Sequence, residues 1–86
     1  MNWDCQLASR AQRALRAMPA SDRTRINHAL NAMKLDPFSG DTIPLKGEYQ
    51  GSHRRRVGAW RIIFRVKSEE HGLLVADIVR RTSSTY

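Results

Sequence analysis

The stretch HRRRVGAWRIIFRV, residues 53–66, combines the alternation of a β-strand with a high density of positive charge, since five of its fourteen residues are arginines. Its first arm is His53–Val57, and its second arm runs from Trp60 to Lys67. Gly58 and Ala59 separate the arms, and a two-residue connection with glycine first favours a type II′ turn. The stretch therefore predicts a β-hairpin, and its charge raises the question of what the arginines bind.

Alternation along a strand assigns the side chains of this hairpin to two faces. An apolar set in the second arm is expected to pack against helices: Trp60, Ile62, Phe64 and Val66. The opposite face of the sheet is expected to gather five arginines: Arg54, Arg56, Arg61, Arg65 and Arg81. Neighbouring guanidinium groups repel one another unless an anion lies between them, and arginine suits bidentate contact with phosphate. The alternative is a solvated basic strand pair that keeps a sheet edge from aggregating.

The residues before the hairpin predict a strand followed by two helices. Residues 2–8 alternate as in a short strand, and apolar residues then recur at helical spacing over 8–18 until Pro19. Ser21 or Asp22 can cap a second helix, which ends at Asp36. The apolar face of that helix is expected to consist of Ile26, Ala29, Leu30 and Met33. Two helices with so short a break form an antiparallel helical hairpin.

The remaining segments complete a small sheet. Residues 36–52 are rich in Pro, Gly, Asp and Ser and predict mostly loop, with a short strand near Ile43 to Lys46. A last strand is predicted from Leu73 to Arg81. We expect its helix-facing side to consist of Leu74, Ala76, Ile78 and Arg80. The result is an α+β fold: an N-terminal strand, a helical hairpin and an antiparallel sheet of three to four strands. Residues 1–86 are expected to form a single domain, with one sheet face covered by the helices and the other open.

Composition narrows the classes of partner. The chain has 15 Lys and Arg against 8 Asp and Glu, a formal net charge of +7 and a pI near 10.8. Such a domain is expected to bind a polyanion, an anionic membrane surface or an acidic protein. No apolar run approaches the ~20 residues that span a membrane, and the first residues lack a secretory signal pattern. The single cysteine, Cys5, fits a core position and a reducing cytoplasm. No Cys and His residues pair as zinc ligands do, so neither a metal nor another cofactor is expected.

Three further residues are candidates for chemistry or binding. His53 adjoins the arginines and could act as a general base near neutral pH, or it is an exposed histidine at a strand end. Arg10 and Arg13 lie off the apolar stripe of the first helix. They either form its solvated side or contact a nucleic-acid backbone.

Three segments taken together resemble one known family. They are LDPFSG…PLKG (residues 35–47), RRRVGAWRIIFRV (54–66) and IVRRTSSTY (78–86), which occur in this order along the chain. Their pattern is similar to that of the RelE/ParE superfamily of type II toxin–antitoxin toxins. RelE-like members cleave mRNA in the ribosomal A site without a metal, whereas ParE-like members poison DNA gyrase. The resemblance covers nearly the whole chain and implies a RelE-like fold.

The resemblance also implies roles for particular residues. Arg54 and Arg56 match the paired basic residues of RelE-like toxins on the strand before the hairpin turn. Arg61 matches the arginine after the hairpin aromatic, and Arg81 matches the arginine of the last strand. Tyr86 matches their C-terminal tyrosine. Arginine stands here where the best-known RelE type has lysine, and it transfers protons poorly because it stays protonated. His53 therefore remains a candidate base. The expected RNA-binding residues are Lys46, Arg55, Arg65, Arg10 and Arg13.

The implied reaction is attack of the RNA 2′-OH on the adjacent phosphate, which develops negative charge that arginines stabilise. The implied partners are the ribosome with its mRNA and a cognate antitoxin, which would form a hetero-oligomer with the toxin. Two alternatives remain open from the sequence. One is a ParE-like DNA gyrase inhibitor, and the other is a non-catalytic RNA-binding protein.

Overall fold

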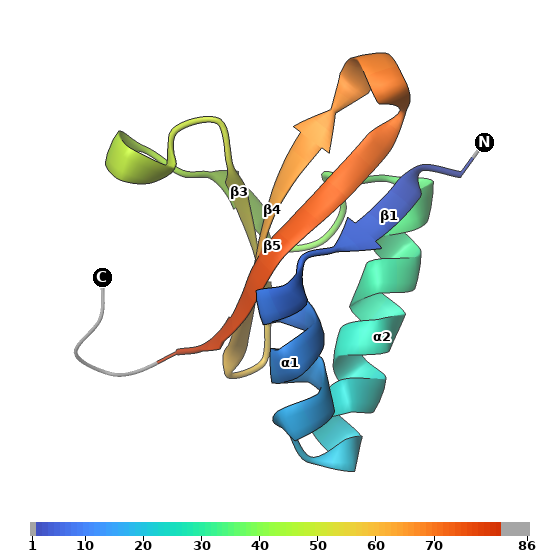
Figure 1. Ribbon diagram of the computed structural model, residues 1–86, viewed down its shortest axis with the longest axis vertical. Helices are drawn as coiled ribbons and strands as arrows, with labels where there is room; N and C mark the ends of the chain where they lie inside the picture. The colour runs from blue at the N-terminus through green and yellow to red at the C-terminus, as the bar shows by residue number, and fades with distance from the viewer. Residues whose placement is uncertain (1, 82–86) are drawn as a thin grey trace.

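A mixed sheet forms the centre of the computed structural model, which describes residues 2–81. Within these residues the sheet has five strands in the order β1-β5-β4-β3-β2 (Figure 1). The strands are β1 (Asp4–Leu7), β2 (Thr42–Pro44), β3 (His53–Val57), β4 (Trp60–Lys67) and β5 (Gly72–Arg80). β1 pairs with β5 in parallel, and the other neighbours are antiparallel. The predicted α+β fold is confirmed, with the N-terminal strand added to a four-stranded antiparallel sheet.

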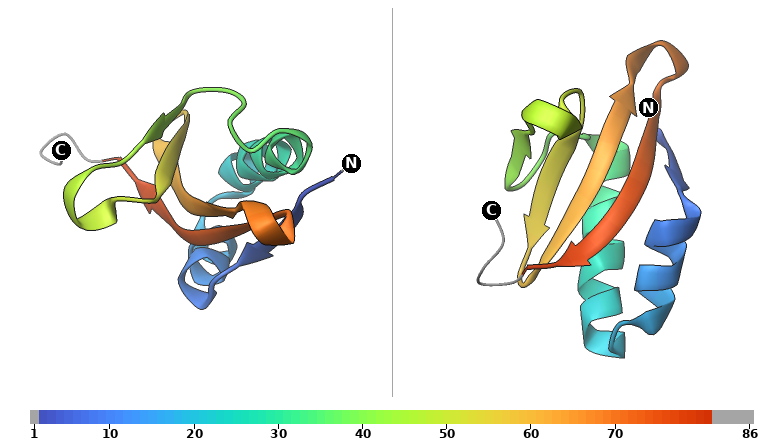
Figure 2. Two further views of the ribbon diagram at one scale, coloured as in Figure 1. Left: turned by 90° about the horizontal axis from the view of Figure 1, so that it is seen from above. Right: turned by 60° about the vertical axis from the view of Figure 1, so that its left-hand side comes forward.

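Two helices, α1 (Ser9–Ala17) and α2 (Ala20–Leu35), cover one face of the sheet and leave the other open (Figure 2). Two short 3-10 helices, η1 (Gly47–Tyr49) and η2 (Ser68–Glu70), lie in the connections. No helix among residues 2–81 is long and apolar enough to cross a membrane.

The start of α2 differs from the prediction that Ser21 or Asp22 would cap it. The helix begins at Ala20, the residue before it is Pro19, and no side chain caps it. Proline has a fixed φ that suits the entry to a helix, so the helix starts earlier than the polar residues suggest. Asp22 lies within the first turn instead, where its negative charge interacts favourably with the positive end of the helix dipole.

The core lies between the helices and the predicted apolar face of the hairpin. Ile62 and Phe64 are fully buried, and Trp60 and Val66 pack against the core at its margin. The predicted apolar face of α2 is buried as well: Ile26, Ala29, Leu30 and Met33. Gly58 has a φ of 57°, as the first position of a type II′ turn requires.

The predicted faces of the last strand are wrong in its first half, because β5 contains a bulge. Ile63 pairs with Asp77 and the next residue, Phe64, pairs with Val75, so Ala76 is an extra residue on β5. An extra residue reverses the alternation of a strand. Leu73 and Val75 are therefore buried in the core, while the expected inward residues Leu74 and Ala76 are not. After the bulge, Ile78 faces the helices as expected.

Candidate nucleic-acid interface

The open face of the sheet is hollowed into a groove with a volume of about 460 Å³. Its floor comes from three strands, and Arg10 of α1 borders it on the side of β5. The floor residues are Arg54, Arg61, Ile63, Ala76, Asp77 and Val79. The segment with β2 and η1 forms the other wall through Ile43, Leu45, Lys46, Tyr49 and Ser52. Figure 2 shows that this segment curls away from the helices, so the wall rises on the open side.

The groove combines positive charge with apolar and aromatic surface. Four of its lining residues are basic, namely Arg10, Lys46, Arg54 and Arg61, and one, Asp77, is acidic. Tyr49 is 57% exposed although it is a large aromatic residue. Nucleic-acid strands bind to grooves of this kind, because phosphates need cations and every base has a face that stacks on an aromatic ring. The groove therefore has the chemistry of a single-strand binding surface.

Arg54 and Arg56 lie on the open face of β3 and share one anion from within the chain. Nη1 of Arg54 lies 3.3 Å from Oδ1 of Asp41, and Nη1 of Arg56 lies 4.0 Å from Oδ2 of the same carboxylate. The Arg54 side chain is only 11% exposed, whereas that of Asp41 is 53% exposed. Repulsion between the two guanidinium groups is thus reduced by Asp41, which the sequence pattern did not single out.

Of Arg61 and Arg81, only Arg61 lines the groove. Arg61 is half-buried, pairs with Arg56 across the hairpin and lines the groove. Arg81 is exposed, and its backbone N–H donates to the carbonyl of Ala59 in the hairpin turn, at 2.7 Å. Arg81 does not line the groove itself. Tyr86, the expected C-terminal site residue, lies outside the described residues.

His53 does not join the arginines, because it precedes Arg54 on the same strand and so points to the opposite face. Its ring lies between two aromatic rings, with centroids 5.1 Å from that of Phe38 and 5.7 Å from that of Phe64. Its Nδ1 is buried and has no hydrogen-bond partner within residues 2–81. His53 is therefore part of the packing on the helix side, and its side chain points away from the groove.

Two of the expected RNA-binding arginines hold loops in place. Nη1 of Arg55 donates to Oγ and to the carbonyl of Ser39, at 2.8 and 3.1 Å. Burial lowers the pKa of Arg55 from its ordinary value. Nη2 of Arg65 donates to the carbonyl of Gln50 beside η1, at 3.3 Å.

Of the two candidate arginines on α1, Arg10 lines the groove and Arg13 does not. Arg10 reaches the groove and lies 3.8 Å from Asp77, measured from Nη1 to Oδ2. Arg13 is exposed on α1 and does not line the groove.

Three groove or groove-side residues, Asp41, Tyr49 and Asp77, were not predicted. Asp41 and Tyr49 lie in a segment that reads as loop, and loop residues carry no periodic signal that assigns them to a face. Asp77 was assigned to the open side of the last strand as a polar residue only. In the structure it lies on that side, beside Arg10.

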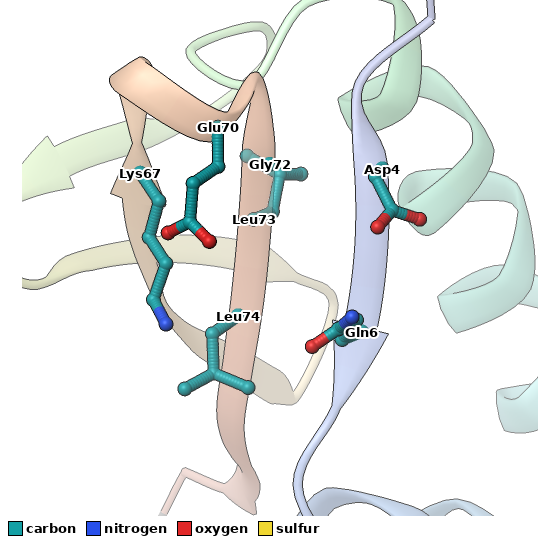
Figure 3. Close-up of a pocket in the computed structure, with 7 residues that line it drawn as sticks. All are labelled: Asp4, Gln6, Lys67, Glu70, Gly72, Leu73 and Leu74. Carbon is teal, nitrogen blue, oxygen red and sulfur yellow. The ribbon is translucent and has the colours of Figure 1, made fainter.

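A second cavity does not resemble a metal or cofactor site. It has a volume of about 50 Å³ and lies where β1 meets the end of the β4–β5 hairpin (Figure 3). Its lining mixes acidic Asp4 and Glu70 with Lys67, and its volume has room for little more than one or two water molecules. Among the residues that the structure describes, no three His, Cys, Asp or Glu side chains are grouped as metal ligands would be.

Comparison with known proteins places this fold. No protein-family model matches the sequence, and no curated protein is significantly similar to it. Solved structures do match. The RelBE2 toxin–antitoxin complex from Mycobacterium tuberculosis has a chain with a TM-score of 0.84 and 20% identity, over 94% of this chain and 100% of that one. This chain has the RelE toxin fold.

Two further RelE-fold structures agree with that match. A chain of the archaeal RelE–RelB complex from Pyrococcus horikoshii has a TM-score of 0.84 and 20% identity, covering 98% of this chain and 100% of its own. The YoeB/ParE toxin from Agrobacterium tumefaciens has a TM-score of 0.79 and 22% identity, covering 92% of this chain and 99% of its own. The identities are low and the TM-scores are high, so what these chains share is the fold.

Proposed function

We propose that this protein is the toxin of a type II toxin–antitoxin system and that it cleaves mRNA at the ribosome without a metal. The observation that carries the proposal is the groove on the open sheet face, in which Arg54 and Arg61 lie near Lys46 and the exposed Tyr49. These groups suit a single RNA strand, because the cations attract its phosphates and the ring stacks on its bases. The RelE fold, which this chain shares with a chain of a toxin–antitoxin complex, supports the toxin part of the proposal.

The proposed reaction is attack by the RNA 2′-OH on the adjacent phosphorus. The new P–O bond closes a 2′,3′-cyclic phosphate, and the P–O bond to the next nucleotide breaks to leave a 5′-OH. Negative charge grows on the phosphorane oxygens, and fixed cations placed there lower the barrier. We assign this stabilisation to Arg54, Arg56, Arg61 and Arg81. Since His53 lies on the other face, we assign proton transfer to Tyr86, assisted by the ribosome.

The proposal includes an antitoxin, because a free toxin of this kind would harm its own cell. Two of the similar structures are complexes of a toxin with an antitoxin, RelBE2 and RelE–RelB. We propose that a cognate antitoxin covers this groove with a segment that is both acidic and apolar, matching the lining. Toxin and antitoxin would then form a hetero-oligomer in the cytoplasm, where the ribosomes are.

Induction of the protein without its antitoxin tests the proposal. We expect translation to stop and mRNAs to be cut within ribosomal A sites, leaving 5′-OH ends. Double-strand DNA breaks with intact messages would instead identify a gyrase poison. Salt-dependent RNA binding without cleavage or toxicity would identify a non-catalytic RNA-binding protein.

Variants of the arginines test the proposed site directly. Arg61→Ala and Arg81→Ala should each fold and lose toxicity, because removing one transition-state contact costs about 10²–10³-fold in rate. Arg16→Ala, an exposed arginine of α1 outside the groove, is the matched control and should retain activity. Single-turnover cleavage of ribosome-bound mRNA is the measurement. Full cleavage by the Arg61→Ala, Arg81→Ala double variant would exclude the site.

A further inference from the structure

Asp41 contacts Arg54 and Arg56 of β3 through three of its atoms. Its carbonyl accepts a hydrogen bond from the backbone N–H of Arg56 at 2.9 Å. Its Oδ1 lies 3.3 Å from Nη1 of Arg54, and its Oδ2 lies 4.0 Å from Nη1 of Arg56. One carboxylate therefore bridges two guanidinium groups that point to the same face from alternate positions of one strand.

A carboxylate in this position presents the same groups as a phosphate. Both offer two anionic oxygens, and both bind the fork of a guanidinium with charge-assisted hydrogen bonds. An RNA phosphate that contacts Arg54 and Arg56 together must therefore compete with Asp41 for the same N–H donors. The two anions cannot both occupy the space between these side chains, because they would repel each other.

Burial decides which partner can move. The Arg54 side chain is 11% exposed, and a buried cation is costly without an anion beside it. The Asp41 side chain is 53% exposed, so it can rotate into water at little cost. Exchange of Asp41 for a phosphate thus keeps Arg54 paired throughout, with the aspartate as the group that leaves.

The backbone on the N-terminal side of Asp41 is fastened to the protein, which restricts the exchange to its side chain. Arg55 donates to Ser39 through Nη1, and Thr42 donates through Oγ1 to the carbonyl of Ser39 at 2.8 Å. Gly40 has a φ of 69°, and a Cβ there would lie 2.8 Å from Cζ of Arg55. The loop is thus packed directly under the Arg55 guanidinium, which holds Asp41 in front of β3.

We propose, with RNA cleavage taken as the function of the protein, that Asp41 is a built-in competitor for RNA phosphate. In the free protein its carboxylate occupies the anion position between Arg54 and Arg56, and an RNA phosphate displaces it on binding. Asp41 keeps both arginines paired with an anion before RNA arrives, and it lowers the affinity for RNA by an amount that depends on its charge.

Neutralising Asp41 tests this directly. A short fluorescein-labelled single-stranded RNA is titrated with the wild type, Asp41→Asn and Glu69→Gln at several salt concentrations, without ribosomes. Asp41→Asn should bind about threefold to tenfold more tightly, as expected for removing the charge of one half-exposed carboxylate that pairs with two arginines. The slope of log K against log salt should steepen by about 0.7, the value for one more uncompensated phosphate contact on a single strand. Glu69→Gln removes the same charge from η2 and should change the affinity less than about twofold.

The Arg56→Gln variant tests whether the gain in RNA affinity comes from the contacts of Asp41 with the arginines. In Arg56→Gln the gain from Asp41→Asn should shrink, because only one of the two ion pairs is left to release. Thermal melting checks that each variant is folded, and Asp41→Ser replaces the asparagine variant if that one does not fold. Folded variants at Asp41 with unchanged or weaker RNA binding would overturn the proposal, and so would a wild type without any affinity for RNA. Such a failure is distinct from failure of the proposed function, which is measured by A-site cleavage.

Discussion

Phe64 of β4 is the core residue with the largest fully buried side chain among residues 2–81. Its side chain is fully buried at the centre of the core, among the largest side chains that are so. The ring of His53 also packs on it, with centroids 5.7 Å apart. A cavity left in such a close-packed core collapses only in part.

Phe64→Ala should destabilise the fold by about 3–5 kcal/mol, through lost transfer energy and the cavity left behind. A domain this small has a total stability of about 5–15 kcal/mol, so we expect much of the variant to be unfolded at physiological temperature. Urea denaturation measures the change. Leu35→Ala, which truncates an apolar side chain that is 70% exposed, is the control and should be nearly neutral. Wild-type melting of Phe64→Ala would show that the strand faces are assigned wrongly.

Cys5 is a half-buried free thiol, and burial raises the pKa of that thiol above its ordinary value. Asp4 raises the pKa further, and Lys34 opposes the shift. Since the thiolate is the reactive form, alkylation by iodoacetamide should be slower than for a solvent-exposed cysteine at neutral pH. Because the pKa of the Cys5 thiol is raised in the folded state, the thiol contributes to the free energy of unfolding. That contribution is complete below the pKa of Cys5 in the unfolded chain, and it is lost as pH rises through the pKa of Cys5 in the folded protein. Equal alkylation rates in buffer and in denaturant would contradict the assignment.

At the level of elements, the side chain of Arg23 in α2 forms hydrogen bonds with the C-terminal end of α1. Arg23 of α2 donates through Nε to the carbonyl of Leu15 at 3.0 Å and through Nη2 to that of Met18 at 3.0 Å. A third bond, from Nη2 to the carbonyl of Arg16, measures 3.3 Å. The last carbonyls of a helix have no partner within it, so Arg23 satisfies groups that would otherwise depend on water.

Arg23→Ala should lower the free energy of unfolding by about 1–3 kcal/mol, since it leaves partly buried carbonyls without a donor. Arg23→Lys should recover only part of this, because an ammonium group lacks the planar fork that reaches several carbonyls at once. Arg25→Ala, an exposed arginine of the same helix, is the control. Thermal melting followed by circular dichroism is the measurement, and equal melting of the two alanine variants would exclude the capping role.

At the scale of the whole molecule, the fold places basic side chains from distant parts of the chain around one groove. Arg10 comes from α1, Lys46 from the segment after β2, and Arg54 and Arg61 from the hairpin. In the proposed function the net charge of +7 would attract RNA without regard to position, whereas the groove would determine which cations meet phosphates. The two contributions separate experimentally through the dependence of binding on salt.

Arg61→Ala should weaken binding of single-stranded RNA and reduce the slope of log K against log salt by about 0.7. Arg13→Ala removes the same charge from the solvated side of α1 and should leave that slope nearly unchanged. Fluorescence anisotropy titrations at several salt concentrations provide both values. Equal changes in slope for the two variants would mean that RNA binds to the overall charge and not to the groove.

The amino-acid sequence by itself determined the order of the strands and the two α-helices, though not the two short 3-10 helices in the connections. The hairpin arms His53–Val57 and Trp60–Lys67 have the predicted bounds in the structure. The buried residues of α2 are the four that the sequence predicts. These features depend on local periodicity, since a strand and a helix repeat every two and 3.6 residues. The separation of Arg54 and Arg56 from Arg55 followed from the same alternation.

Tertiary structure alone decided the bulge at Ala76, the packing of His53 and the pairing of Asp41 with Arg54 and Arg56. The bulge depends on register between β4 and β5, which no single strand records. Asp41 lies 13 residues from Arg54 in a loop without periodicity, and their contact exists only because the loop returns along β3. Local patterns specify which residues share a face, whereas contacts between loops and strands depend on how the whole chain closes around its core.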